Sequence, residues 1–109
     1  MRLAVARMPG GPDELREVAT ALRKRLEPEG GVVLGATADG KALLVAACTA
    51  GLVARGVTAP NLIAEAAATV GGKGGRRTPD LAFAGGSRAD ALDPALAGIP
   101  ARLLGLLGG

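Results

Sequence analysis

The sequence predicts an α/β (α+β) domain, a small sheet of about four strands with helices packed on it and a glycine-rich loop at one edge. Three observations predict this fold. An apolar stripe at helical spacing follows Gly11, two apolar runs flank an Asp-Gly pair, and glycine pairs gather between residues 71 and 86. No repeat or linker divides the 109 residues, so we expect a single domain, 1–109.

The first two elements carry clear boundary signals. Leu3–Met8 reads as a short strand, and a helix follows with Gly11 as N-cap and Pro12 at the first helical position. Acidic residues in its first turn favour the positive end of the helix dipole. Its apolar stripe consists of Leu15, Val18, Ala19, Leu22 and Leu26. Glu27–Gly31 ends the helix.

The next two apolar runs predict a hairpin. Val32–Ala38 and Lys41–Cys48 are joined by Asp39-Gly40, a pair typical of a tight turn with positive φ at both central residues. Neither run alternates between polar and apolar residues. We therefore expect both strands to be central in the sheet and covered on both faces.

The second half of the chain carries weaker signals for helices and strands. Glycines weaken any helix over Thr49–Gly56, so that segment stays open. Pro60 begins a nearly buried helix that runs through Val70 into the glycine-rich loop. After the loop, Pro79–Ala84 is expected to be a short extended segment.

The C-terminal part predicts two more helices. Gly85-Gly86 leads into a helix over residues 88–97, with Ser87 as the expected N-cap. A last apolar stretch, Ala101–Leu107, is either a helix that packs on the sheet or a surface that docks on another domain.

Few side chains in this sequence can do chemistry. The chain has no histidine, and Phe83 is its one aromatic residue, so the core must be built from small aliphatic side chains. Cys48 is the single cysteine, which rules out a zinc site of four thiolate or imidazole ligands and predicts a buried, inert thiol. We expect no cofactor, no metal and no catalysis by this domain.

The remaining polar residues do not form a convincing catalytic set. Asp80, Asp90 and Asp93 are better explained as loop and helix-capping residues than as a carboxylate pair. Asp80 in particular is expected to fix the loop by accepting hydrogen bonds from backbone N–H groups. Ser87 has no histidine to activate it.

The positive charge gathers in two places. The chain has a formal charge of +3 and a pI near 9.8, a mild excess. Arg23, Lys24 and Arg25 form a basic run that either solvates a helix face or makes secondary contacts with phosphate. Lys73, Arg76 and Arg77 stand among glycines instead. No apolar run of about 18 residues predicts a membrane span, and no signal peptide is apparent, so cytoplasm is expected.

The glycine-rich loop is the strongest functional signal. Glycines around Lys73 permit unusual backbone angles and let a ligand approach the main chain. Backbone N–H groups and neighbouring cations can then converge on a phosphate, and arginine can bind it bidentately. A flexible solvent-exposed loop is the alternative. The predicted nucleic-acid contacts are Gly71, Gly72, Lys73, Gly74, Gly75, Arg76, Arg77, Gly85, Gly86 and Arg88.

The order of these residues resembles the C-terminal globular domain of bacterial alanyl-tRNA synthetase, which is also found attached to DHH-type phosphoesterases. That family carries Gly-Gly-x-Gly-Gly-Gly-Arg-Pro-Asp-x-Ala, followed by two variable positions and then a glycine pair. The matching residues are Gly71, Gly72, Gly74, Gly75, Arg77, Pro79, Asp80, Ala82, Gly85 and Gly86. The resemblance extends to the leading helix, the hairpin and Ala89–Leu92.

The sequence departs from the family pattern at three positions. Arg76 stands where a third consecutive glycine is usual, and Thr78 lengthens the segment by one residue. Phe83 occupies a position where the synthetases often carry glutamine. An aromatic residue there either fills the core or stacks on a base.

The resemblance implies a domain that helps to hold alanine-specific tRNA at its outer corner. The implied partners are that tRNA, the aminoacylation and editing domains of a parent synthetase, and a second copy in a homodimer; no membrane partner is implied. Phosphate contacts alone do not exclude single-stranded or double-stranded DNA. Two alternatives stay open. The chain would otherwise be the substrate-binding module of a DHH-type nuclease or oligonucleotide phosphatase, or a dimerisation domain that uses Leu103–Leu107.

Overall fold

A five-stranded mixed sheet organises the computed structural model, which describes residues 2–108 and, of residues 73–77, the backbone alone. The strand order is β1-β2-β3-β5-β4. The strands are β1 (Arg2–Arg7), β2 (Gly30–Ala38), β3 (Lys41–Cys48), β4 (Gly72–Thr78) and β5 (Leu81–Gly86). β1 runs parallel to β2, and every other neighbouring pair is antiparallel.

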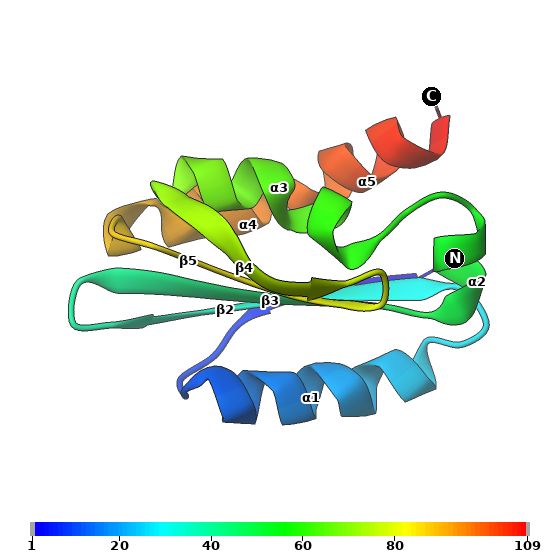
Figure 1. Cartoon of the computed structure of the whole chain (residues 1–109), viewed down its shortest axis with the longest axis horizontal. Helices are drawn as coiled ribbons and strands as arrows, with labels where there is room; N and C mark the ends of the chain where they lie inside the picture. The colour runs from blue at the N-terminus through cyan, green and yellow to red at the C-terminus, as the bar shows by residue number, and fades with distance from the viewer. Residues whose placement is uncertain (1, 109) are drawn as a thin grey trace.

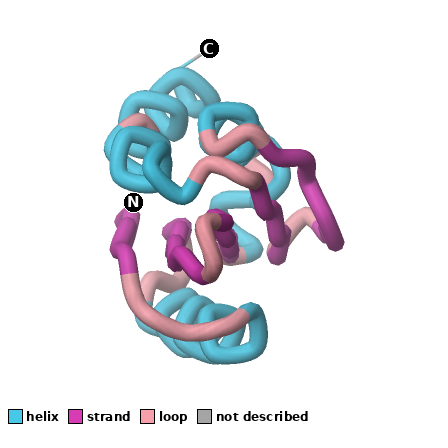
Figure 2. The backbone as a smooth tube through the Cα atoms, turned by 90° about the vertical axis from the view of Figure 1, so that its left-hand side faces the viewer, coloured by secondary structure: helices cyan, strands magenta, loops and turns pink. Residues whose placement is uncertain are grey.

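Helices cover the two faces of this sheet unequally (Figure 1). Helix α1 (Pro12–Arg25) packs alone on one face. The opposite face carries α3 (Ala59–Thr69), α4 (Leu92–Ala97) and α5 (Ile99–Gly108). Figure 2 shows the three layers from the end of the sheet. The predicted α/β (α+β) fold is confirmed, with one more strand than the four expected.

Each layer boundary has its own apolar core. The smaller cluster joins α1 to the sheet through Leu15, Ala19, Val32, Leu34 and Val45. The larger one lies under α3, α4 and α5 and is built mainly from alanine, leucine and valine. Because β2 and β3 contribute to both clusters, the prediction that these strands are covered on both faces is correct.

The first helix and the hairpin form as their sequence signals predict. Gly11 adopts an extended N-cap conformation, and its amide lies 3.4 Å from the Glu14 carboxylate. Between β2 and β3, Asp39 and Gly40 have φ values of 53° and 77°, as a two-residue hairpin turn requires.

Two segments differ from the sequence-based expectation. The open segment after β3 contains α2 (Ala50–Ala54), because the Thr49 hydroxyl accepts hydrogen bonds from the amides of Leu52 and Gly30. The prediction of Ser87 as an N-cap is wrong. A 3-10 turn at Ala89–Ala91 separates β5 from α4, so the first α-helical residue is Leu92.

The C-terminal helix α5 packs against α3 and α4, buries Ile99 and Leu103, and leaves Leu104 68% exposed. Within residues 2–108, no single helix is long and apolar enough to cross a membrane. The segments Ala89–Ala97 and Ile99–Gly108, which meet at an angle of 44°, satisfy the length and composition of a span only when they are taken together.

Candidate nucleic-acid interface

The predicted glycine-rich loop is a strand. Residues 72–78 form β4, which pairs with β5 and lies at the edge of the sheet. Glycine is depleted in strands, which favoured a loop from the sequence alone. Pairing with β5 overrides that preference because it satisfies the backbone groups on one side of β4. The edge position was correctly predicted, and the other side of β4 has no neighbouring strand in the described sheet.

The glycines at the start of β4 have steric roles. Gly71 has a φ of 72° and follows the last turn of α3, where a left-handed residue commonly ends a helix. Gly72 and Gly86 pair in the sheet register. A Cβ atom on Gly72 would overlap the Gly85 carbonyl, and one on Gly86 would overlap the Val70 carbonyl. Of the glycines assigned to anion binding, Gly72 and Gly86 are therefore required by close backbone packing and Gly71 by its positive φ.

The pairing register of β4 shifts between Gly74 and Arg77. Gly74 pairs with Ala84, and Arg77 pairs with Ala82. Two residues, Gly75 and Arg76, therefore stand opposite the single residue Phe83, as in a β-bulge. The side chains of Lys73, Arg76 and Arg77 lie outside the described part of the structure, so their predicted contacts stay predictions.

Arg88 lies at the start of β4. Its amide donates to the Val70 carbonyl at 2.9 Å, and its side chain packs over Gly71 while remaining exposed. The structure thus gathers Gly71, Gly72, Gly86 and Arg88 at one end of the β4–β5 pair. The prediction that Gly85-Gly86 opens a helix, with its amides aimed at an anion, is wrong, since both residues belong to β5.

The turn between β4 and β5 is anchored at the other end of the pair. Its Asp80 carbonyl accepts a hydrogen bond from the Cys48 amide at 2.9 Å and from Arg23 Nη1 at 3.1 Å. The Pro79 carbonyl accepts from the Ala59 amide at 2.8 Å. The turn is therefore tied to β3, α1 and α3, and these contacts fix where β4 lies.

The Asp80 carboxylate strengthens this anchor. The Thr78 hydroxyl donates to Oδ1 at 2.8 Å, and Arg23 Nη1 lies 3.3 Å from Oδ2. These contacts, together with its own backbone amide, lower the pKa of Asp80, and the Thr78 hydrogen bond is the largest cause. The extra residue Thr78 therefore has a structural role. The general expectation that Asp80 holds the turn is matched, although its main partners are side chains.

The basic run on α1 splits into two roles. Arg23 is largely buried and forms an ion pair with Asp80. Lys24 and Arg25 are exposed and line an open groove of about 670 Å³ beside Leu81. The sequence analysis missed Arg16, which also lines this groove. Its spacing of eight residues from Lys24 places both on one face of the helix, a signal that was available from the sequence.

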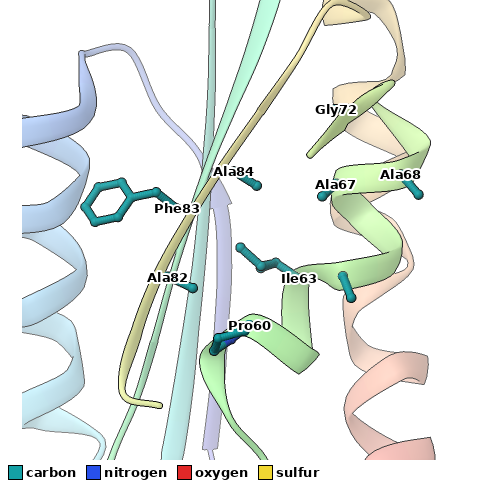
Figure 3. Close-up of a pocket in the computed structure, with 9 residues that line it drawn as sticks. Pro60, Ile63, Ala67, Ala68, Gly72, Ala82, Phe83 and Ala84 are labelled. Atoms are coloured by element: carbon teal, nitrogen blue, oxygen red, sulfur yellow. The ribbon is translucent and has the colours of Figure 1, made fainter. Parts of the chain in front are cut away.

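Strand β5 presents different side chains to its two faces (Figure 3). Ala82 and Ala84 point toward α3 and line a pocket of about 170 Å³ with Ile63 and Ala67. The Phe83 ring points the opposite way, toward α1. It packs half-buried against the smaller apolar cluster, which agrees with the core-filling alternative, yet it also lines a hollow beside Arg16.

The described residues offer little for catalysis. Cys48 is fully buried, and this burial raises the pKa of its thiol to about 12, so the expectation of an inert thiol is supported. Asp93 pairs with Arg7 at 2.9 Å while Asp80 pairs with Arg23, so these carboxylates belong to separate ion pairs. Within residues 2–108, no group of three or more Cys, Asp or Glu side chains is arranged to hold a metal ion.

Comparison with known proteins relates this fold to one family. The chain is 48% identical over 95 residues to the alanine–tRNA ligase of Anaeromyxobacter dehalogenans, an alignment that covers 87% of the chain and 10% of that enzyme. The alanine–tRNA ligase of Herpetosiphon aurantiacus is 48% identical over 96 residues, which cover 87% of the chain and 11% of the enzyme. The chain thus spans about a tenth of the length of these relatives. No family model matches the chain.

The structural comparison agrees. The crystal structure of the C-Ala domain from Aquifex aeolicus alanyl-tRNA synthetase matches with a TM-score of 0.78 at 26% identity and covers 94% of this chain and 89% of that domain. By sequence and by fold, the chain belongs to the family of C-Ala domains of alanyl-tRNA synthetases.

Proposed function

We propose that this domain binds tRNA through the outer edge of β4 and the cations on that strand. The single observation that carries the proposal is the position of β4: the strand richest in glycine and in clustered positive charge is an unpaired edge of the described sheet. Its kinship with the C-Ala domain of a tRNA synthetase supports tRNA as the nucleic acid.

An edge strand of this composition suits a phosphate backbone. Its outward N–H groups can donate to phosphate oxygens, and glycines leave the main chain accessible. Lys73, Arg76 and Arg77 add three positive charges within five residues of the strand. Arg88 adds an exposed guanidinium at the strand's first residues, where it packs over Gly71. Contacts of this kind position a nucleic acid and carry little sequence information.

Rigid placement of β4 is the structural condition for such binding. The turn anchors of Asp80 and Pro79 fix one end of the strand, and the close packing of Gly72 on Gly86 fixes the other. A preorganised strand loses less conformational entropy when it binds. We infer that the domain itself is non-catalytic and works in the cytoplasm beside aminoacylation and editing domains, which carry the chemistry.

The test is tRNA binding measured at several salt concentrations. The triple variant Lys73→Ala/Arg76→Ala/Arg77→Ala should bind more weakly, and its slope of log affinity against log salt should be about 2 to 3 units shallower, because each phosphate contact contributes about 0.7 to 0.9. The matched control Arg2→Ala/Arg7→Ala/Arg55→Ala removes the same charge from β1, at the opposite edge, and from the residue that follows α2.

The two variants separate local contact from general attraction. The control should keep a slope close to that of the wild type. Equal losses of tRNA affinity in both variants would mean that net charge alone drives binding. Unchanged tRNA affinity of the β4 variant would place the site elsewhere. Duplex and single-stranded DNA of equal length, used as competitors, show how far binding extends beyond tRNA.

Self-association is a second candidate function, favoured by one observation. Leu104 on α5 is 68% exposed although most large apolar residues of the described chain are buried. Leu104→Glu should lower the apparent mass in sedimentation equilibrium if α5 joins two copies. An unchanged monomer mass for both proteins would remove this candidate.

A further inference from the structure

A groove runs along the flank of α1 on the face of the sheet that α1 covers alone. Two hollows form it, an open one of about 670 Å³ and a deeper one of about 240 Å³. Both are lined by Arg16 and Leu81, so they adjoin each other. We call it the α1–β5 groove, and its argued lining residues are Arg16, Lys24, Arg25, Thr78, Leu81 and Phe83.

The floor of the deeper hollow is aromatic. Phe83 points toward α1 (Figure 3) and packs half-buried on the smaller apolar cluster. The hollow beside it shows that part of the ring is accessible. Arg16, on α1, lines the same hollow. A planar ring and a guanidinium are the two kinds of group that stack on unpaired bases in RNA-binding proteins.

The open hollow supplies the charge that a nucleotide requires. Lys24 and Arg25 line it, and neither they nor Arg16 form an ion pair with a carboxylate among the described residues. The third cation at this end of α1, Arg23, forms an ion pair with Asp80. Glu17 is the one acidic residue in the lining. The groove therefore combines an aromatic ring with three cations, which suits a base with its attached phosphate.

The register of β4 places another arginine near Phe83. Gly75 and Arg76 stand opposite Phe83 in the bulge. Arg76 and Phe83 are thus neighbours across two strands.

We propose that the α1–β5 groove binds an unpaired nucleotide of RNA, with its base stacked on Phe83 beside Arg16 and its phosphate held by Lys24 and Arg25. This inference rests on the proposed function and adds a second contact to it, on the α1 face next to the edge strand β4. A base in a duplex is already stacked and cannot enter, so the groove selects single-stranded or flipped-out nucleotides.

The wild-type chain contains no tryptophan and no tyrosine, so the Phe83→Trp variant carries a single fluorescent side chain in the groove. Single-stranded hexaadenylate should quench its emission, and a fully paired RNA duplex of equal length should not. Equal quenching by both RNAs, or by neither, would overturn the proposal.

Affinity for the labelled hexanucleotide provides a second measurement. Phe83→Leu keeps an apolar side chain but removes the ring, and should weaken binding about 5-fold to 30-fold. Phe83→Tyr keeps the ring and should bind as the wild type does. Arg16→Gln should weaken binding, and the control Arg2→Gln, which removes an exposed arginine from β1 at the opposite edge of the sheet, should not. Thermal unfolding of each variant confirms that it is folded. If Phe83→Leu does not fold, the affinities of Phe83→Tyr and Arg16→Gln test the proposal instead.

The outcomes distinguish this proposal from the function on which it rests. Suppose that Phe83→Leu binds the hexanucleotide as tightly as the wild type while tRNA binding depends on β4. The proposed nucleotide site in the α1–β5 groove is then wrong, and the proposed tRNA binding through β4 is retained. If the wild type binds no tRNA in the salt titration, both fail.

Discussion

Arg23 and Asp80, which are 57 residues apart in the chain, join α1 to the turn that sets the position of β4. The guanidinium donates to both the backbone carbonyl and the carboxylate of Asp80, at 3.1 and 3.3 Å. A residue that the sequence assigned to phosphate contact therefore has an internal partner. This pair links the helix layer to the edge strand on which the proposed function depends.

A double-mutant cycle on Arg23→Ala and Asp80→Asn measures this link. More than half of the Asp80 side chain is exposed, so solvent screening limits the coupling to about 0.5 to 1 kcal/mol. Each single variant should lower the free energy of unfolding, and the double variant should lose less than the sum. Additive losses, measured by urea denaturation, would show that the pair contributes no coupling.

The stability that Asp80 contributes should depend on pH in a defined direction. The pKa of its carboxyl is lowered in the folded state, first by Thr78 and then by its own amide and Arg23. The contribution is therefore present above the unfolded-state pKa of about 3.9 and is lost as the pH falls through the lowered folded value. The difference in unfolding free energy between wild type and Asp80→Asn should shrink below about pH 4. A difference that stays constant from pH 7 to pH 2 would contradict this assignment.

Glycine 72 should resist replacement for steric reasons. Gly72→Ala would drive a methyl group into the Gly85 carbonyl, so we expect destabilisation of about 2 kcal/mol or more as the β4–β5 pair separates. Gly105→Ala is the matched control, because a Cβ there meets no atom within 4 Å and the residue lies in α5. The free energy of unfolding of the control should rise by about 0.5 to 1 kcal/mol. Thermal denaturation of both variants checks the contrast, and a neutral Gly72→Ala would refute the steric account.

Cys48 should be unreactive in the folded protein. Its thiol is fully buried, with its pKa raised to about 12, so almost no thiolate is present at pH 8. Iodoacetamide should label the thiol rapidly in 6 M guanidinium and only at the rate of unfolding without it. Mass spectrometry over time measures this. Fast labelling of the native protein would show that β3 is more accessible than the structure indicates.

Much of the fold was predictable because local signals and burial agree there. The cap at Gly11 and the stripe that contains Leu15 and Ala19 define α1, and Asp39-Gly40 defines the hairpin. The central strands were identified because neither alternates. In each case a short-range pattern and the tertiary environment favour the same element.

The candidate site was harder to predict because its contacts are long-range. Glycine-rich β4 becomes a strand only because β5 pairs with it, and Gly72 is needed because Gly86 approaches it across the sheet. Likewise, nothing near Arg23 in the sequence indicates that Asp80 occupies it. Arg16 was missed because its importance comes from Phe83, 67 residues away, which lines the same hollow.

The most direct test of the central claim follows the backbone amides of the isotope-labelled protein by NMR while tRNA is added. We predict that the largest shifts or line broadening fall on Gly72–Thr78 and Arg88, with Arg2–Arg7 at the opposite edge unchanged. Perturbations confined to β1 or α5, with the β4 amides unmoved at saturating tRNA, would contradict the account.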